Sequence, residues 1–201
     1  MNLIIISSTL ILCIAIYFAI RRSNKEILTA EQDFWEKEKK ANFVRKKPLD
    51  DLDYVTIPDE ILYMKPDNTS PEISDCLNEL KTLADEKIVN LTGISNTDLK
   101  LTYGTANITI LTEYDFNYTK MVILLQKLAE QLYECGENEL AIKVLEFAVS
   151  TGTDVSKSYY LLSSLYDDAG TPEKKKFLIQ QAQGIHSIMK DNIIRTLKAS
   201  S

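Results

Sequence analysis

The chain has 201 residues, of which 45% are hydrophobic and 26% are charged, and its formal net charge is −6. This composition excludes a disordered or collagen-like polymer and fits one globular domain of moderate size with attached segments. Residues 48–201 hold 14 Lys/Arg against 24 Asp/Glu, a net charge of −10 that would repel phosphates, so we expect no nucleic-acid partner.

Residues 3–20 carry no charge and are almost wholly apolar. As a helix they would extend about 27 Å at ~1.5 Å per residue, close to the ~30 Å hydrocarbon core of a bilayer. A cleaved signal peptide is disfavoured because no Lys or Arg precedes the run. A lipoprotein signal is disfavoured because bulky Leu12 precedes Cys13. We therefore predict that residues 1–22 are a transmembrane anchor.

The basic residues that could set the orientation of this anchor all follow it. Arg21, Arg22 and Lys25 come directly after the apolar run, which predicts a single-pass protein of the plasma membrane with its C-terminal domain in the cytoplasm. Residues 21–47 have nine Lys/Arg and five Asp/Glu, a net charge of +4 that would attract an anionic leaflet.

Residues 23–69 are predicted to be a juxtamembrane helix followed by an extended linker. Ile27, Phe34 and Ala41 recur at heptad spacing, so the helix would carry a narrow apolar stripe. It would either lie among the lipid headgroups with Trp35 as an interfacial anchor, or be a solvated spacer. Three prolines then exclude a continuous helix and favour an extended tether: Pro48, Pro58 and Pro66.

Residues 70–201 are predicted to be an all-α domain. Ser70 and Pro71 have the residue types of an N-cap and a first helical position, and Gly93 is a candidate end for that helix. A short helix capped by Asn96 or Ser95 is expected to stop at Gly104, and residues 105–117 are expected to form an ordered loop packed by Ile108, Ile110 and Leu111. From residue 118 onward the helical periodicity is interrupted only near residues 136, 152–154 and 170–171.

Residues 122–155 and 156–189 align with one another at a spacing of 34 residues. Apolar positions coincide, among them Leu125 with Tyr159 and Leu128 with Leu162, and Gly136 coincides with Gly170. This pattern resembles the tetratricopeptide repeat, a helix–turn–helix unit whose copies stack. The second unit departs from that pattern at Lys175, which occupies a small-residue position. In neither unit does the expected final proline occur; the residues there are Thr153 and Ser187.

A resemblance covering the whole soluble region adds a second implication. The stretches FWEKEKKANFVRKKPLDDLDYVTIP, NLTGISNTDLK and AIKVLEFAVSTGTDVS resemble a group of uncharacterised, single-span membrane-anchored proteins of anaerobic Gram-positive bacteria. The resemblance implies a membrane anchor followed by helical repeats, and no activity. A long C-terminal helix from residues 171–172 to about Leu197 would either close the repeat stack or bind a partner.

The sequence offers no motif for catalysis, a cofactor or a metal, so we expect none of these sites and no enzymatic activity. The single histidine, His186, has no second ligand at metal-binding spacing. Helical repeats instead present a concave surface that binds peptides or helices. We expect a membrane-tethered scaffold for a cytoplasmic protein, with contacts near Asn138, Lys143 and Lys157. The alternative is a self-associating structural protein whose repeat face takes its own linker or a second copy.

Overall fold

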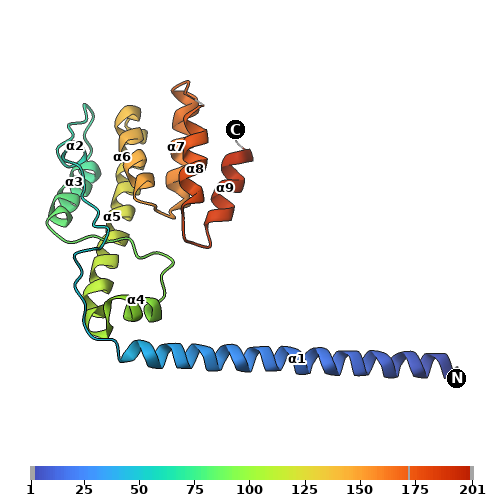
Figure 1. Cartoon of the computed structure of the whole chain (residues 1–201). Helices are drawn as coiled ribbons and strands as arrows, with labels where there is room; N and C mark the ends of the chain where they lie inside the picture. The colour runs from blue at the N-terminus through green and yellow to red at the C-terminus, as the bar shows by residue number, and fades with distance from the viewer. Residues whose placement is uncertain (1–2, 172, 200–201) are drawn as a thin grey trace. The chain divides into compact units, whose positions relative to one another are not determined.

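The computed structural model of the chain is all-helical (Figure 1). It describes residues 3–171 and 173–199, with side chains from residue 7 onward. Within these ranges the only β-type pairing is an isolated bridge between Tyr54 and Val89. The expected all-α class is therefore confirmed. Pro172, expected near the start of the last helix, lies outside the described residues.

The chain divides into two compact units along boundaries that differ from the expected ones. The first unit comprises the chain up to Lys47 together with Ser95–Ile108, and the second comprises Pro48–Ile94 and the chain from Thr109 onward. Residues 95–108, expected within the repeat domain, thus belong with the N-terminal helix. The linker residues 48–69, expected outside the domain, belong to the repeat unit.

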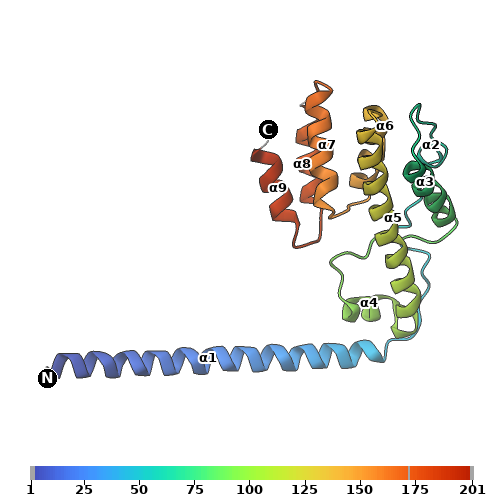
Figure 2. The same cartoon turned by 180° about the vertical axis from the view of Figure 1, so that it is seen from behind.

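The first unit is built on α1 (Leu3–Asn42), one uninterrupted helix of 40 residues (Figure 2). The apolar run and the juxtamembrane helix were expected as separate elements. They are continuous because residues 3–42 contain neither Gly nor Pro, the residues that most often break a helix. At the junction, Arg22 Nε contacts Glu26 Oε1 at 2.9 Å, and Thr29 Oγ1 donates to the Lys25 carbonyl at 2.9 Å.

The N-terminal part of α1 exposes apolar side chains in every direction around the helix. They are Leu10, Ile11, Leu12, Ile14, Ile16, Tyr17, Phe18 and Ile20. Residues 3–6, the start of the predicted span, lie outside the residues whose side chains are described. In the remaining described part of the chain, no helix combines the length and the apolar character that crossing a bilayer requires.

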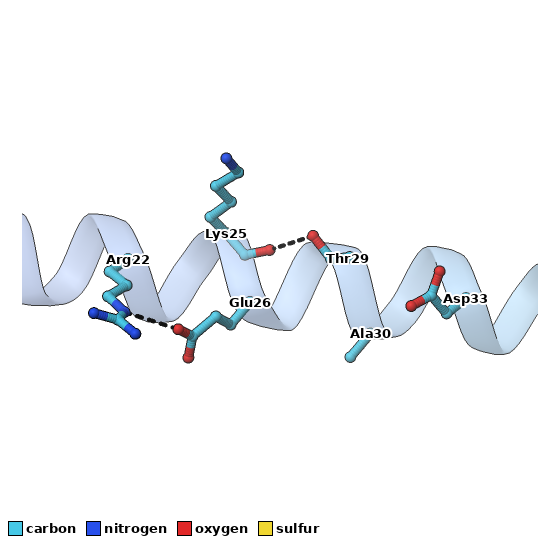
Figure 3. Close-up of a pocket in the computed structure, with 6 residues that line it drawn as sticks. All are labelled: Arg22, Lys25, Glu26, Thr29, Ala30 and Asp33. Atoms are coloured by element: carbon cyan, nitrogen blue, oxygen red, sulfur yellow. Dashed lines mark hydrogen bonds and ion pairs between the residues drawn. The ribbon is translucent and has the colours of Figure 1, made fainter.

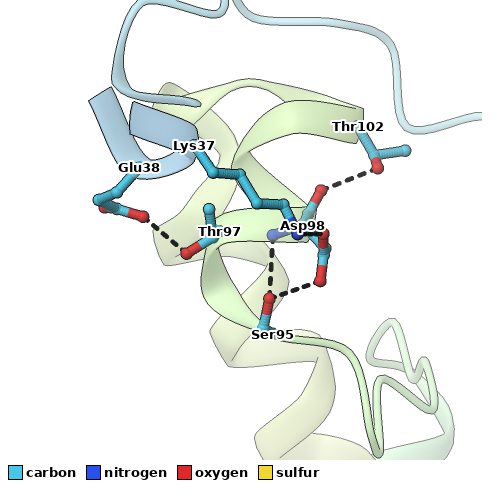
Figure 4. A network of polar contacts seen from close by, with 6 residues as sticks. All are labelled: Lys37, Glu38, Ser95, Thr97, Asp98 and Thr102. Carbon is cyan, nitrogen blue, oxygen red and sulfur yellow. Dashed lines mark hydrogen bonds and ion pairs between the residues drawn. The ribbon is translucent and has the colours of Figure 1, made fainter. Parts of the chain in front are cut away.

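The expected short helix is present as α4 (Asn96–Tyr103), which packs on the C-terminal part of α1. Its N-cap is Ser95, whose Oγ accepts from the Asp98 amide at 3.2 Å, and it ends at Gly104. Asp98 also accepts from Lys37 Nζ at 2.6 Å, and Thr97 donates to Glu38 at 2.6 Å (Figure 4). These contacts attach α4 to one face of α1.

The linker is packed against the second unit instead of forming a free tether. Its one-turn helix α2 (Asp59–Leu62) lies against α3 (Pro71–Ala84), and its apolar residues Ile57, Ile61 and Leu62 are buried in the common core. The Val55 amide donates to the Ile88 carbonyl at 2.9 Å. The prolines prevent a long helix, as expected. Burial of the apolar residues between them stabilises the packing of the linker against the second unit.

Helix α3 begins as predicted and ends earlier than predicted. Ser70 Oγ accepts from the Ile73 amide at 3.2 Å, which confirms the N-cap. The helix stops at Ala84 and not near Gly93. Beyond it, Ile88 lies in an irregular segment and its side chain is buried. The backbone of this segment pairs with distant residues: the Ile88 carbonyl accepts from the Val55 amide, and the Val89 amide donates to the Tyr114 carbonyl.

Residues 105–117 were expected to be a loop but are helical. A single 3₁₀ turn, Thr105–Asn107, leads into α5 (Ile108–Glu134). Buried Asn107 stabilises this start, because its Nδ2 donates to the carbonyls of Tyr103 and Lys47, each at 2.8 Å. Of the apolar residues expected to pack the loop, only Leu111 is fully buried.

The 34-residue alignment corresponds to two helical hairpins with matching turns. They consist of the second half of α5 with α6 (Asn138–Ser150), and α7 (Ser156–Asp168) with α8 (Lys174–Gln183). In the first turn the Glu137 amide donates to the Leu132 carbonyl at 2.8 Å; in the second, Thr171 donates to Tyr166 at 2.9 Å. Gly136 and Gly170 have φ of +81° and +67°, which permits these turns without strain.

At the two positions where the repeat pattern has proline, a side-chain hydroxyl accepts a hydrogen bond from the backbone. Thr153 Oγ1 accepts from the Val155 amide at 3.2 Å, and Ser187 Oγ accepts from the Met189 amide at 3.3 Å. Each contact lies just before the next helix and turns the chain into it. At the small-residue position, Ala141 is fully buried, and buried Lys175 places its Nζ 2.6 Å from Asp167 Oδ2.

The long C-terminal helix that we expected is broken near Gly184. It forms α8 and a separate α9 (Lys190–Ala199), which packs against α7 and α8. Lys190 follows Ser156 by 34 residues, and Ile193 is fully buried like its counterparts Leu125 and Tyr159. Helix α9 therefore corresponds in position to the first helix of a hairpin, and it covers the end of the stack. Closing the stack was one of the two roles expected for the C-terminal helix.

Candidate functional site

The candidate site is a surface groove between α5 and α7, which we call the α5–α7 groove. It has a volume of about 410 Å³ and is lined by Gln126, Glu130, Tyr133, Glu134, Lys157, Tyr160 and Leu161. These residues come from the first helices of successive hairpins. Their position follows from the 34-residue spacing, which brings the same helical face of each hairpin to one side of the stack.

The floor of the groove is held by a chain of polar contacts. Buried Ser158 donates from Oγ to Gln126 Oε1 at 2.5 Å, and Gln126 Nε2 donates to Glu130 Oε1 at 3.0 Å. Lys157 Nζ lies 3.6 Å from the same Glu130 oxygen. Because Gln126 and Ser158 are buried and paired with each other, they fix the spacing of the two helices and present a preformed surface.

The walls of the groove supply apolar and aromatic area. Tyr133 is exposed, and Tyr160 and Leu161 are half-buried. The Tyr160 hydroxyl accepts from Asn192 Nδ2 at 3.4 Å, so α9 reaches the rim. Aromatic rings that are partly buried and rigidly held are the residues that contribute most at protein interfaces. The groove can therefore accept an apolar side chain of a partner.

The charge of the second unit favours a cationic partner. Its sequence holds 13 Lys/Arg against 23 Asp/Glu, a net charge of −10. In the groove itself Glu130 and Glu134 outnumber Lys157. Opposite charge steers association and favours a ligand that carries Lys or Arg beside its apolar anchor.

The structure separates the three contact residues that the sequence suggested. Lys157 lines the α5–α7 groove. Asn138 is exposed at the start of α6, in a different depression that it shares with Lys65 and Asp67. Lys143 is exposed on α6, outside the groove lining. Sequence reasoning missed Tyr133 and Tyr160, because no pattern in the sequence shows which helical face remains uncovered.

The predicted membrane-interface residues, Arg21, Arg22, Lys25 and Trp35, all lie on α1 and are exposed. A shallow depression beside them is lined by Arg22, Lys25, Glu26, Thr29, Ala30 and Asp33 (Figure 3). All six belong to one helix, as Figure 3 shows, and a single helix does not enclose a small molecule.

Ionisable groups elsewhere show the effects of burial. His186 lies in the segment between α8 and α9, where its carbonyl packs against Gly93, and not within a helix as expected. Burial raises the pKa of Tyr118 to about 12 and also raises the pKa values of Tyr159 and Tyr166. Within the described residues, no cluster of three His, Cys, Asp or Glu could hold a metal ion.

Comparison with known proteins does not identify a family: no family model, curated protein or solved structure matches the chain.

Proposed function

We propose that the protein is a membrane-tethered adaptor that holds a cytoplasmic protein at its α5–α7 groove. The observation that carries this proposal is a preformed, open groove on the helical hairpins, lined by exposed Tyr133 and half-buried Tyr160. Surfaces of this kind bind peptides and helices through side chains. In this proposal the chain acts by binding, without catalysis and without a cofactor.

The tether is α1. The uncharged run of residues 3–20 supports it, as does the exposure of apolar side chains on all sides of the helix from Leu10 to Ile20. A helix that is apolar all round is stable when it is buried in protein or in lipid, and α1 buries none of these side chains. The basic residues after the run support a location of the rest of the chain in the cytoplasm, at the plasma membrane.

The partner segment is expected to combine an apolar residue with Lys or Arg. Its apolar side chain would pack between Tyr133 and Tyr160, and its cation would approach Glu134. Such a segment binds as an amphipathic helix or an extended peptide. Any partner of net positive charge would also be attracted by the acidic unit as a whole.

The second candidate function is self-association, in which another copy occupies the groove. The version in which the chain's own linker fills the groove is not favoured, because that linker packs on α3 and on residues 88–89. A second copy would bring basic residues of its own, since the first unit has a net charge of +4.

Two experiments test the proposal. Alkaline carbonate should leave the full chain in the membrane pellet and release a variant that lacks residues 3–20. Release of both chains would refute the proposal that residues 3–20 are a membrane anchor. Affinity capture from detergent-solubilised membranes should recover a stoichiometric partner with the wild type and with Lys143→Asp, but not with Leu161→Asp. Equal capture by all three chains, with circular dichroism showing that each one is folded, would refute the α5–α7 groove as the binding site.

A further inference from the structure

We propose that the part of α1 beyond residue 20 is a stalk that projects away from the bilayer, and not a helix that lies along the membrane surface. This inference rests on the proposed function, because it takes residues 3–20 as the anchor. Between Ile20 and Asn42 the helix extends about 33 Å at ~1.5 Å per residue. Three independent observations on the first unit support a projecting helix.

The first observation is the continuity of α1. A helix that crosses a bilayer must bend sharply to lie along the surface, and such bends occur at Pro, at Gly or Ser pairs, or at bulges. Residues 21–27 offer only a single Ser23, and Arg22 pairs with Glu26 across this turn at 2.9 Å. The structure shows one helix through the junction (Figures 1 and 2).

The second observation is the order of residues around α1. With 100° between successive residues, Ile27, Phe34 and Ala41 form one stripe, and Leu28 and Trp35 form another about 100° away. Glu31 and Glu38 project between the two stripes. A helix that buried both stripes in the headgroup region would turn these carboxylates toward the hydrocarbon, which strongly disfavours a charged group.

The third observation is that α4 covers the C-terminal end of this face. Glu38 pairs with Lys100. Glu38 also accepts from Thr97 Oγ1 at 2.6 Å, and Lys37 pairs with Asp98 at 2.6 Å (Figure 4). Ala41, on the same stripe, is fully buried. The bond from Lys100 lowers the pKa of Glu38, so that carboxylate stays ionised. A bilayer and α4 cannot both contact this end of the face.

The same acidic residues argue against pairing of two parallel stalks. In a parallel pair that packed the apolar stripes together, Glu31 and Glu38 of one helix would face the same residues of the other. Like charges in that position are destabilising. These charges disfavour a parallel pair of stalks packed through the two stripes, and Ile27, Leu28 and Trp35 are exposed along α1.

Trp35 is the only tryptophan of the chain and reports directly on this geometry. It lies 15 residues after Ile20, so a straight stalk places it about 22 Å beyond the end of the anchor. A surface helix would instead hold it in the headgroup region, within contact of the lipid chains. The full chain in vesicles whose lipids carry bromine on the acyl chains distinguishes these positions.

We expect Trp35 fluorescence to be the same in brominated and ordinary vesicles and to be lost on addition of aqueous iodide. The matched control is Tyr17→Trp in a Trp35→Phe background, which places the fluorophore in the anchor; its emission should be lost in brominated vesicles. Quenching at both positions would overturn the stalk and leave the anchor intact. Absence of quenching at position 17 would overturn the anchor, and with it the stalk and the tethered part of the proposed function.

Discussion

Leu128 and Leu162 occupy the same place in successive hairpins, and their truncation tests whether the two units are packed alike. Both side chains are fully buried in the common core. Replacing a fully buried leucine by alanine removes its transfer free energy and leaves a cavity, which together destabilise a protein by about 2–5 kcal/mol. Because the hairpins match at this position, Leu128→Ala and Leu162→Ala should fall within that range and close to one another.

The free energy of unfolding can be measured for the full chain in detergent micelles, with urea and far-ultraviolet circular dichroism. For a unit of this size each kcal/mol corresponds to about 2–4 °C, so the melting temperature should fall by roughly 4–20 °C in both variants. Ile123→Ala is the control, because Ile123 is exposed on α5, and its effect should stay within about 0.5 kcal/mol. If either leucine variant lost almost no free energy of unfolding, the two hairpins would not be packed alike at this position.

Further predictions concern the turns, a buried alanine of α5 and alkaline pH. Gly136→Ala and Gly170→Ala should each reduce stability by about 1–2 kcal/mol, because φ is positive but an added Cβ has open space. Gly93→Ala should lower the melting temperature far more than either, since its Cβ would lie 2.1 Å from the His186 carbonyl oxygen; equal effects would contradict the close packing of that segment. Ala129→Leu should destabilise by about 1–3 kcal/mol in the same assay, because Ala129 is fully buried in the core and a larger side chain would overpack it. A neutral result would show unused space there. Burial raises the pKa of Tyr118 from 10.0 in the unfolded chain to about 12, so its proton stabilises the fold below pH 10, and about 2 kcal/mol of this stabilisation is lost as the pH rises from 10 to 12. Urea titrations between pH 9 and 12 should show this loss in the free energy of unfolding, and Tyr118→Phe should reduce it. If the free energy of unfolding fell with pH as steeply in Tyr118→Phe as in the wild type, the hydroxyl would not be buried.

Features decided by neighbouring residues were predictable from the sequence. Ser70 is the expected N-cap of α3, Ser95 is one of the two residues expected to cap α4, and Gly104 ends α4. The 34-residue spacing also predicted which positions are buried together, including Leu125 with Tyr159. These features depend on side-chain type at short range or on a repeated pattern, and a single sequence contains both kinds of information.

Features decided by contacts between distant segments were not predictable. The end of α3 at Ala84 depends on Val55 and Tyr114 pairing with residues 88 and 89. The packing of the linker depends on space beside α3, which no local pattern reveals. For the candidate site, only Lys157 was identified in advance, because the exposed face of α5 and α7 is set by how the hairpins stack.

The most direct test of the adaptor places a photoreactive phenylalanine derivative at Tyr160 in native membranes. The account predicts an adduct with a protein other than this 22.9 kDa chain. The same probe at Lys143, outside the groove, should give no such adduct, and Glu134→Lys should abolish the adduct at Tyr160 by repelling a cationic partner. An adduct only between two copies of the chain, or equal labelling from positions 160 and 143, would contradict it.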